Sequence, residues 1–320
     1  MSKTVVVALG GNAIQQADEE PTYINQLNNI KKSCKFLSLL VKQGYRLVIT
    51  HGNGPQVGRL LQQNEEAQNV VPPFPLDVLN AQTQGFIGYM IEQSLLNELK
   101  QNHLTVSVVS MMTRVQVSSE DEDYLDPSKP VGTFYTEEEA KQLQVSNRWK
   151  MKKDANRGWR RVVPSPKPLR ILGADTIREL SENGNIVIAG GGGGIPVICK
   201  STDADVGIEA VIDKDRSGCK LAEEIEADVF MVLTDIDHVY VNYGKADEKA
   251  LENLTVDELE KYIEEGHFSK GSMGPKVEAA LSFAKTGGTS IICALDKAEE
   301  ALQGQTGTIV NPVEKQVTVS

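Results

Sequence analysis

Two short turns near the N-terminus combine glycine with asparagine directly after an apolar run, at 10–12 and at 52–54. Glycine lets a ligand approach the main chain closely, and successive exposed N–H groups form a concave nest for an anion. A third glycine-rich segment, at 189–197, also follows an apolar run. A tight connection between a strand and a helix would explain one such turn, but three of them predict a site that binds phosphate or carboxylate. The residues of the first two turns are Gly10, Gly11, Asn12, Gly52, Asn53 and Gly54.

Three lysines lie in contexts that suit a phosphorylated ligand. Lys214 lies in VIDKD before a predicted helix, and Lys276 lies just inside a helix introduced by GSMGP. A helix N-terminus already favours anions, so the Lys276 ammonium suits the β-phosphate of a nucleotide. Lys129 lies between prolines in DPSKPVG. A lone lysine is normally a solvated surface residue, so the prediction depends on these contexts.

Carboxylates beside the lysines predict how the cations are oriented. Asp215 follows Lys214 and would orient lysines through ion pairs, while an N-cap is its alternative and compatible role. In LTDIDHVYVNYG (233–244), carboxylates such as Asp235 suit ribose hydroxyls and a tyrosine suits adenine, although an ordinary polar loop explains the segment equally well. Phosphoryl transfer requires mainly positioned groups that neutralise charge. The residues therefore favour that chemistry.

Several other kinds of site are not expected. The chain has no G-x-x-x-x-G-K-[ST], and its first turn lacks the glycine spacing of a dinucleotide-binding fold, which excludes P-loop proteins and disfavours Rossmann dehydrogenases. His51 precedes a glycine turn, where a structural, hydrogen-bonded histidine is favoured over a catalytic base. The cysteines lack the spacing of a zinc site or disulfide framework. Cys219, near the charged motif, is the one that could be reactive.

Composition limits the class of protein. The 320 residues carry a net charge of −11, which disfavours broad nucleic-acid binding but permits a small anionic ligand. No apolar stretch approaches the length of a membrane span, and the N-terminus does not resemble a signal peptide. We therefore expect a soluble, cytoplasmic protein with neither nucleic acid nor membrane as a partner.

Strand and helix patterns alternate along most of the chain. Helices are predicted around 27–41, around 79–100 and after Thr255. The first ends before Gly44, and the last begins with a capping box of Thr255 and Glu258. This alternation predicts an α/β fold with a mostly parallel sheet covered by helices on both faces, and ligands bind at the carboxyl ends of its strands. The predicted buried strands are 5–9, 47–50, 106–110, 185–190, 228–233 and 289–294.

The alternation is lost between residues 113 and 170, where an acidic run precedes a basic run. We interpret this segment as a small folded protrusion. RVQVS at 114–118 and WRRVV at 159–163 both alternate and are predicted to pair as a hairpin. Its charged flanks would then face each other, which is favoured over a nucleic-acid surface.

These motifs together resemble the carbamate kinase family of the amino acid kinase superfamily, over essentially the whole chain. The resemblance implies a three-layer αβα sandwich with a small protruding subdomain (about 113–170). It further implies a single domain, 1–320, with an N-terminal lobe (about 1–200) for carbamate and dimerisation and a C-terminal lobe (about 201–320) for the nucleotide. The motifs that carry it are ALGGNA, HGNGPQVG, DPSKPVGTFYT, RRVVPSPKP, AGGGGIPV, VIDKD, LTDIDHVYVNYG and GSMGPKVEAA.

The resemblance also implies an activity. Carbamate kinases transfer phosphoryl reversibly between ATP and carbamate with Mg²⁺, usually as homodimers, and often form ATP from carbamoyl phosphate and ADP in arginine catabolism. Carbamate is already an anion, so no general base is needed. The alternatives are an amino acid kinase that acts on a larger carboxylate and a nucleotide-binding regulator without catalysis.

Residue roles follow from the resemblance. The two glycine–asparagine turns would cradle carbamate and the transferred phosphoryl, and no direct protein ligand for the metal is implied. Lys214 and Lys276 would stabilise charge, Asp215 would orient them, and Lys129 would replace a lysine that relatives carry where Ala8-Leu9 stands here. Arg216 and Thr133 look atypical. The nucleotide site would be lined by Lys214, Asp235, Tyr243, Gly271, Met273, Gly274 and Lys276.

Overall fold

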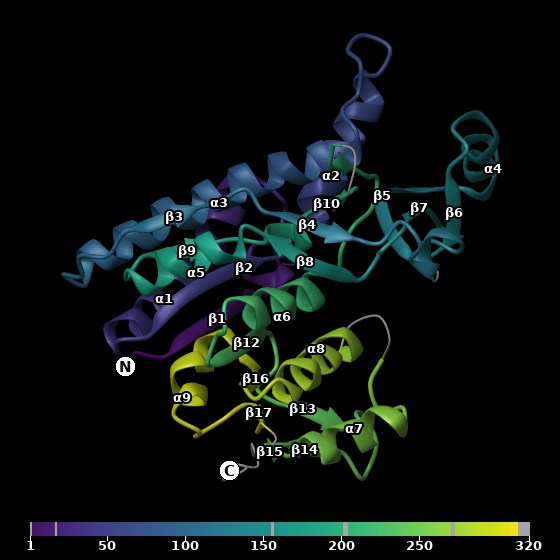
Figure 1. The fold of residues 1–320 in the computed structure, drawn as a ribbon. Helices are drawn as coiled ribbons and strands as arrows, with labels where there is room; N and C mark the ends of the chain where they lie inside the picture. The colour runs from purple at the N-terminus through teal and green to yellow at the C-terminus, as the bar shows by residue number, and fades with distance from the viewer. Residues whose placement is uncertain (1, 17, 155–156, 201–203, 270–272, 313–320) are drawn as a thin grey trace.

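The apolar runs form the centre of an eight-stranded sheet with the order β15-β17-β16-β12-β1-β2-β9-β3 (Figure 1). The computed structural model describes residues 2–16, 18–154, 157–200, 204–269 and 273–312. Every neighbouring pair is parallel except β16 and β17. The strands are β1 (Thr4–Leu9), β2 (Arg46–His51), β3 (Val108–Ser110), β9 (Ile186–Ile188), β12 (Val229–Thr234), β15 (Asn253–Leu254), β16 (Thr289–Ala294) and β17 (Thr308–Val310).

Helices cover both faces of this sheet, so the predicted three-layer α/β sandwich is confirmed. Strand β1 shows why: Val5 and Val7 join one apolar cluster and Val6 and Ala8 join the other, because successive side chains of a strand point to opposite faces. One face packs on α1 (Tyr23–Lys42), α3 (Leu76–Gln101) and α9 (Ala298–Leu302). The other packs on α5 (Ala174–Glu182), α6 (Lys214–Glu224), α7 (Val256–Glu264) and α8 (Met273–Lys285).

The remaining elements extend from the sandwich. A second sheet has the order β11-β10-β4-β8 and a third the order β5-β7-β6, and β13 pairs with β14. Their bounds are β4 (Arg114–Val117), β5 (Lys129–Tyr135), β6 (Lys150–Lys153), β7 (Trp159–Val163), β8 (Pro168–Leu172), β10 (Ile195–Ile198), β11 (Val206–Gly207), β13 (Val239–Val241) and β14 (Lys249–Leu251). Also present are α2 (Gly54–Ala67), α4 (Glu137–Ser146), η1 (Gly11–Ala13), η2 (Glu122–Tyr124), η3 (Gly191–Gly193) and η4 (Leu295–Lys297).

The predicted hairpin between 114–118 and 159–163 is wrong. Strand β4 pairs with β8 and β10, whereas β7 lies between β5 and β6. The reason is burial: Val115 and Val117 on β4 belong to the main core, so this strand needs partners that stay close to the sandwich. Alternation identified both strands but not their partners.

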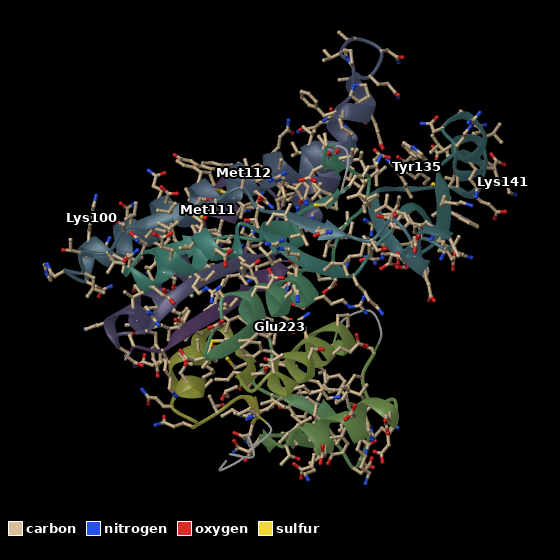
Figure 2. All side chains as sticks on the ribbon, in the orientation of Figure 1. Lys100, Met111, Met112, Tyr135, Lys141 and Glu223 are labelled. Carbon is tan, nitrogen blue, oxygen red and sulfur yellow. The ribbon has the colours of Figure 1, made fainter. Side chains whose placement is uncertain are left out.

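The three-stranded sheet and α4 form the protruding part of the molecule. Figure 2 shows Tyr135 and Lys141 there, away from the central sheet. Opposite charges meet on it as expected, since Lys152 pairs with Asp126 at 2.8 Å. Its base is held to α2 by an apolar cluster of Val57, Leu61, Leu76, Leu79, Val131 and Val163.

Local signals at helix ends are confirmed. Thr255 and Glu258 form the predicted capping box at the start of α7. Gly44 lies just beyond the end of α1 with φ of +88°, a conformation that glycine adopts without strain. Across the described residues, no helix is both long and apolar enough to cross a membrane.

Candidate active site

The three glycine turns lie side by side, because β1, β2 and β9 are adjacent parallel strands and each turn follows a carboxyl end. Together with three lysines, they line a cavity of about 220 Å³. A side chain would not fit there: a Cβ on Gly192, whose φ is +66°, would lie 2.2 Å from Asn53 Nδ2. The cavity is lined by Gly11, Gly52, Asn53, Gly54, Lys129, Gly192, Val211, Ile212, Asp213, Lys214, Asp215, Pro275 and Lys276.

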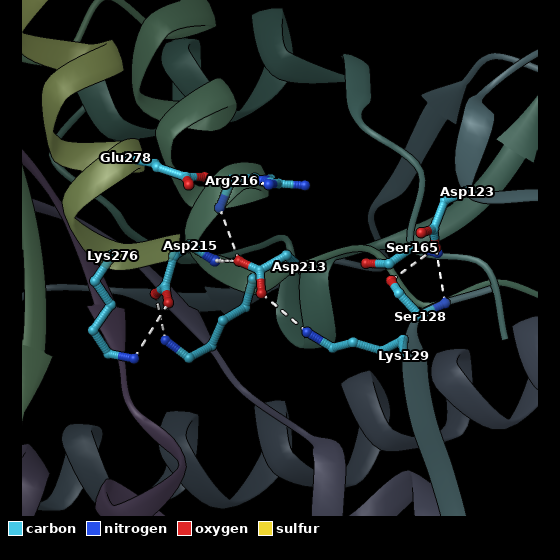
Figure 3. Close-up of polar contacts among 10 residues, drawn as sticks. Asp123, Ser128, Lys129, Ser165, Asp213, Asp215, Arg216, Lys276 and Glu278 are labelled. Atoms are coloured by element: carbon cyan, nitrogen blue, oxygen red, sulfur yellow. Dashed lines mark hydrogen bonds and ion pairs between the residues drawn. The ribbon is translucent and has the colours of Figure 1, made fainter. Parts of the chain in front are cut away.

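Two ammonium groups meet on one buried carboxylate in the wall of this cavity (Figure 3). Lys214 Nζ lies 2.5 Å from Asp215 Oδ1, and Lys276 Nζ lies 3.5 Å from Oδ2. The Asp215 side chain is only 4% exposed. A buried carboxylate is tolerated when it is paired, so Asp215 and the two lysines stabilise one another. The predicted ion pairs of Asp215 are therefore present.

The start of helix α6 brings Lys214 and Asp215 to the cavity. Asp213, and not Asp215, is the N-cap: its Oδ1 accepts from the N–H groups of Asp215 at 2.9 Å and Arg216 at 3.3 Å. An N-cap must precede the first helical residue, which is Lys214. Asp215 is instead in the first turn, where a carboxylate also complements the helix dipole.

Lys129 reaches the cavity from the first position of β5, on the protruding sheet. Its Nζ lies 3.0 Å from Asp213 Oδ2. Burial by itself would raise the pKa of Asp213, but Lys129, the Arg216 N–H and Lys214 together lower it to about 2. Asp213 is therefore a carboxylate at every physiological pH.

A second cavity, of about 470 Å³, shares Gly11 and Lys276 with the first. Gly10 and Asn12 line it together with Asp235, and Asn12 Nδ2 donates to Asp235 Oδ2 at 3.2 Å. Asn12, predicted to bind the substrate, and Asp235, predicted to bind the nucleotide, are thus in contact.

The other residues predicted for the nucleotide are placed less closely. Met273 begins α8, and Gly274 is buried with its N–H donating to Ser269 O at 2.8 Å. Tyr243 is 73% exposed, packs beside Tyr240 and lines neither cavity. Gly271 lies outside the described residues.

Amide side chains of α3 support the glycine turns, and sequence reasoning missed them. Asn53 Nδ2 donates to Asn80 Oδ1 at 2.5 Å and to Thr83 Oγ1 at 2.8 Å. Gln84 Nε2 donates to Gly191 O at 2.9 Å. Asn80, Thr83 and Gln84 are spaced i, i+3 and i+4 and so share one face of the helix, which was the available signal. Asp213 was missed as well, although it lies in the quoted VIDKD.

Two residues have their reactivity limited by burial. His51 is fully buried with Nδ1 against Gly52 O, and burial lowers its pKa to about 4, so it is a neutral structural histidine as expected. Burial and the neighbouring Glu223 raise the pKa of Cys219, which therefore stays a thiol, contrary to the expectation that it could be reactive.

Of the two residues that looked atypical in the sequence, Arg216 pairs with Glu278 at 3.2 Å and Thr133 lies on β5.

No group of three or more His, Cys, Asp or Glu side chains within the described part of the chain could hold a metal ion. Chemically, the arrangement offers main-chain amides and three ammonium groups around a small cavity, with two carboxylates between the cations. Such a site binds a group with several negative oxygens and stabilises charge that develops on it.

Known proteins carry the same arrangement of elements. The sequence model of the amino acid kinase family matches residues 3–294. Carbamate kinase of Thermococcus kodakarensis is 52% identical over 312 residues, which are 96% of this chain and 99% of the relative. Carbamate kinase of Pyrococcus horikoshii is 50% identical over 315 residues, 98% of this chain and 100% of the relative. The structure of carbamate kinase from Giardia lamblia bound to AMP-PNP superposes with a TM-score of 0.93 at 43% identity, covering 98% of this chain and 99% of that one.

Proposed function

The chain belongs to the amino acid kinase family and, within it, to the carbamate kinases, which are ATP-dependent enzymes, and we propose that it transfers phosphoryl reversibly between ATP and carbamate. In one direction a carbamate oxygen attacks the γ-phosphorus, and the bond from that phosphorus to ADP breaks. In the other direction, carbamoyl phosphate and ADP give ATP. The observation that carries the proposal is the buried carboxylate of Asp215 between two ammonium groups, in the wall of a small cavity lined by glycine.

The geometry suits a reaction without a general base. Carbamate is already an anion, no histidine is among the described residues that line the first cavity, and His51, which precedes Gly52 in the second glycine turn, is buried and neutral. Catalysis then depends on position and on neutralising the equatorial oxygens of the transferred group. We assign this task to the N–H groups of the two glycine–asparagine turns and to Lys129, Lys214 and Lys276, with Asp215 orienting the last two.

We further propose that the nucleotide lies beside the cavity, on the C-terminal half of the chain. The second cavity supports this position, because it shares Lys276 with the first and adds Asp235. A cation shared by both cavities would contact the bridging region between the transferred group and ADP. Met273, Gly274, Tyr243 and Gly271 remain assigned to this site by resemblance.

Mg²⁺ is proposed to arrive with the nucleotide. Asp213 and Asp215, the carboxylates that line the first cavity, are both paired with lysines, so phosphate oxygens and water would supply most of its ligands. When bound, the ion would neutralise charge on the phosphates.

The biological setting is also a proposal. We propose net ATP formation within arginine catabolism, in the cytoplasm. We also propose a homodimer, and the exposed Phe86, Tyr89 and Met112 on and beside α3 are consistent with a protein contact there.

A larger carboxylate is the alternative substrate. The small volume of the first cavity favours carbamate, although Val211, Ile212 and Pro275 in its wall would also tolerate an aliphatic group. The test is ATP formation from ADP with carbamoyl phosphate and, separately, with N-acetylglutamyl phosphate. We expect turnover with carbamoyl phosphate only. Turnover with N-acetylglutamyl phosphate alone would support the larger carboxylate as the substrate, and nucleotide binding without turnover of either compound would indicate a regulator.

A further inference from the structure

Asp213 makes a different contact with each of its two carboxylate oxygens. Oδ1 caps α6 through the N–H groups of Asp215 and Arg216, and Oδ2 accepts from Lys129 Nζ at 3.0 Å (Figure 3). The cap belongs to the helix that carries Lys214 and Asp215, whereas Lys129 belongs to the protruding sheet. One side chain therefore joins the two parts of the molecule that supply cations to the cavity.

The charge of Asp213 requires this pairing. Its side chain is 15% exposed and lines the cavity assigned to the transferred phosphoryl. An unpaired carboxylate there would repel a phosphate. Lys129 neutralises it, and because an ammonium group has three N–H donors, two remain for a ligand.

The chain on either side of Lys129 is held in place independently. Asp123 Oδ2 accepts from the Ser128 N–H at 3.3 Å and from Ser128 Oγ at 3.0 Å. Val131 packs into the apolar cluster with α2. The backbone around Lys129 is thus fixed, and the contact with Asp213 determines where its flexible side chain ends.

We propose that Asp213 is a positioning residue for phosphoryl transfer, which holds the Lys129 ammonium at the cavity while it caps α6. This inference rests on the proposed function and adds a residue to it. Asp213 acts through Lys129 and does not itself contact the transferred group. Loss of its charge should therefore affect turnover more than binding.

The first test is Asp213→Asn, since asparagine is as good an N-cap as aspartate but is neutral and cannot form an ion pair with the Lys129 ammonium group. We expect kcat for ATP formation to fall about tenfold to a hundredfold. KM for carbamoyl phosphate should stay the same or fall, because a negative charge leaves the cavity. The melting temperature should be nearly unchanged. The matched control is Glu278→Gln, which removes a carboxylate from the exposed Glu278–Arg216 pair and should leave kcat unchanged.

The second test is a double-mutant cycle with Lys129→Met. If Asp213 acts through Lys129, Asp213→Asn should have no further effect on kcat in the Lys129→Met background. An equal decrease in both backgrounds, or wild-type kcat in Asp213→Asn alone, would overturn the proposal. Asp213→Ser, which can cap the helix but cannot reach Lys129, should reproduce the asparagine variant. A large loss of melting temperature in both variants together with a raised KM would show that the substitutions disturb the fold although the cap is kept, and would overturn the positioning role.

A readout without turnover separates this inference from the proposed function. Mild acetylation followed by mass spectrometry should label Lys129 several-fold faster in Asp213→Asn than in the wild type. If the wild type forms no ATP from carbamoyl phosphate, the proposed function fails, and the labelling still tests the contact. Equal labelling in both proteins would overturn the positioning role regardless of activity.

Discussion

Replacement of Asp215 by asparagine tests the electrostatic basis of the site directly. Asparagine keeps the shape of the side chain but removes the negative charge between Lys214 Nζ and Lys276 Nζ, which lie 2.5 and 3.5 Å from the carboxylate oxygens. An ion pair near 4 Å is worth about 4 kcal/mol at an effective dielectric constant of about 20. The two ammonium groups would repel each other without it and move apart.

The expected effect on turnover is smaller than that Coulomb energy. The lysine side chains are 17% and 16% exposed, so water reaching the cavity screens part of the repulsion. Loss of one preorganised electrostatic group typically lowers kcat by about 10² to 10³, or roughly 3 to 4 kcal/mol. We expect Asp215→Asn to fall in this range. Its free energy of unfolding should also decrease by about 3 kcal/mol, the lower end for a broken buried pair, because two partly buried cations lose their partner.

The assay is initial-rate ATP formation from ADP and carbamoyl phosphate, with thermal unfolding measured on the same samples. Asp175→Asn is the matched control, since Asp175 pairs with Arg178 at 3.0 Å but is 87% exposed, and surface pairs contribute little. The control should match the wild type in both measurements. A kcat for Asp215→Asn within threefold of the wild type would refute the assignment of Asp215 as the residue that orients both lysines.

Three further predictions concern the cavity and the fold beneath it. Lys276→Ala should lower kcat by about a hundredfold or more in the same assay, and near-normal turnover would contradict its assignment. Gly192→Ala should abolish turnover, since its Cβ would lie 2.2 Å from Asn53 Nδ2. Gly184→Ala is the control: Gly184 has a similar positive φ but no atom within 4 Å of an added Cβ, so this variant should lose stability and keep its activity. Equal activities of the two variants would contradict this reasoning. His51 has a pKa of about 4 in the folded state against 6.5 ordinarily, so between these pH values the unfolded state binds more protons than the folded state. The free energy of unfolding should therefore fall by up to about 3 kcal/mol as pH drops from 6.5 to 4. Urea unfolding of His51→Gln should show a flatter dependence of this free energy on pH, and an unchanged slope would contradict the argument.

The sheet and the glycine turns could be predicted because their signals are local. A run such as VVVAL is buried on both faces, and the structure places it at the centre of the sheet. Turns that follow adjacent parallel strands must lie together at one edge, so a composition of glycine and asparagine was enough to locate the cavity. The positions of Lys214 and Lys276 followed from their helix N-termini in the same way.

Contacts between distant segments could not be predicted. Strand β4 alternates as β7 does, and only the packing of Val115 and Val117 against the main core decides that its partners are β8 and β10. Asn80 Nδ2 donates to Gly194 O and Gln84 Nε2 donates to Gly191 O, across 114 and 107 residues of the chain. Asp213 was visible in VIDKD, but a cap and an ion pair with Lys129, 84 residues away, cannot be read from the motif alone.

The carboxylates between the lysines have a consequence for a reaction that runs in both directions. Lys129, Lys214 and Lys276 carry three positive charges into the cavity, and Asp213 and Asp215 return two negative charges. Binding that is equally strong for substrate and transition state does not accelerate the chemical step, so an excess of positive charge would mainly retain ADP or carbamoyl phosphate. With the carboxylates present, the cations are held in fixed positions and the net attraction for anions is reduced. Removal of either carboxylate should therefore tighten the binding of an anionic ligand while it slows transfer, and this opposite movement of affinity and rate distinguishes positioning from simple attraction.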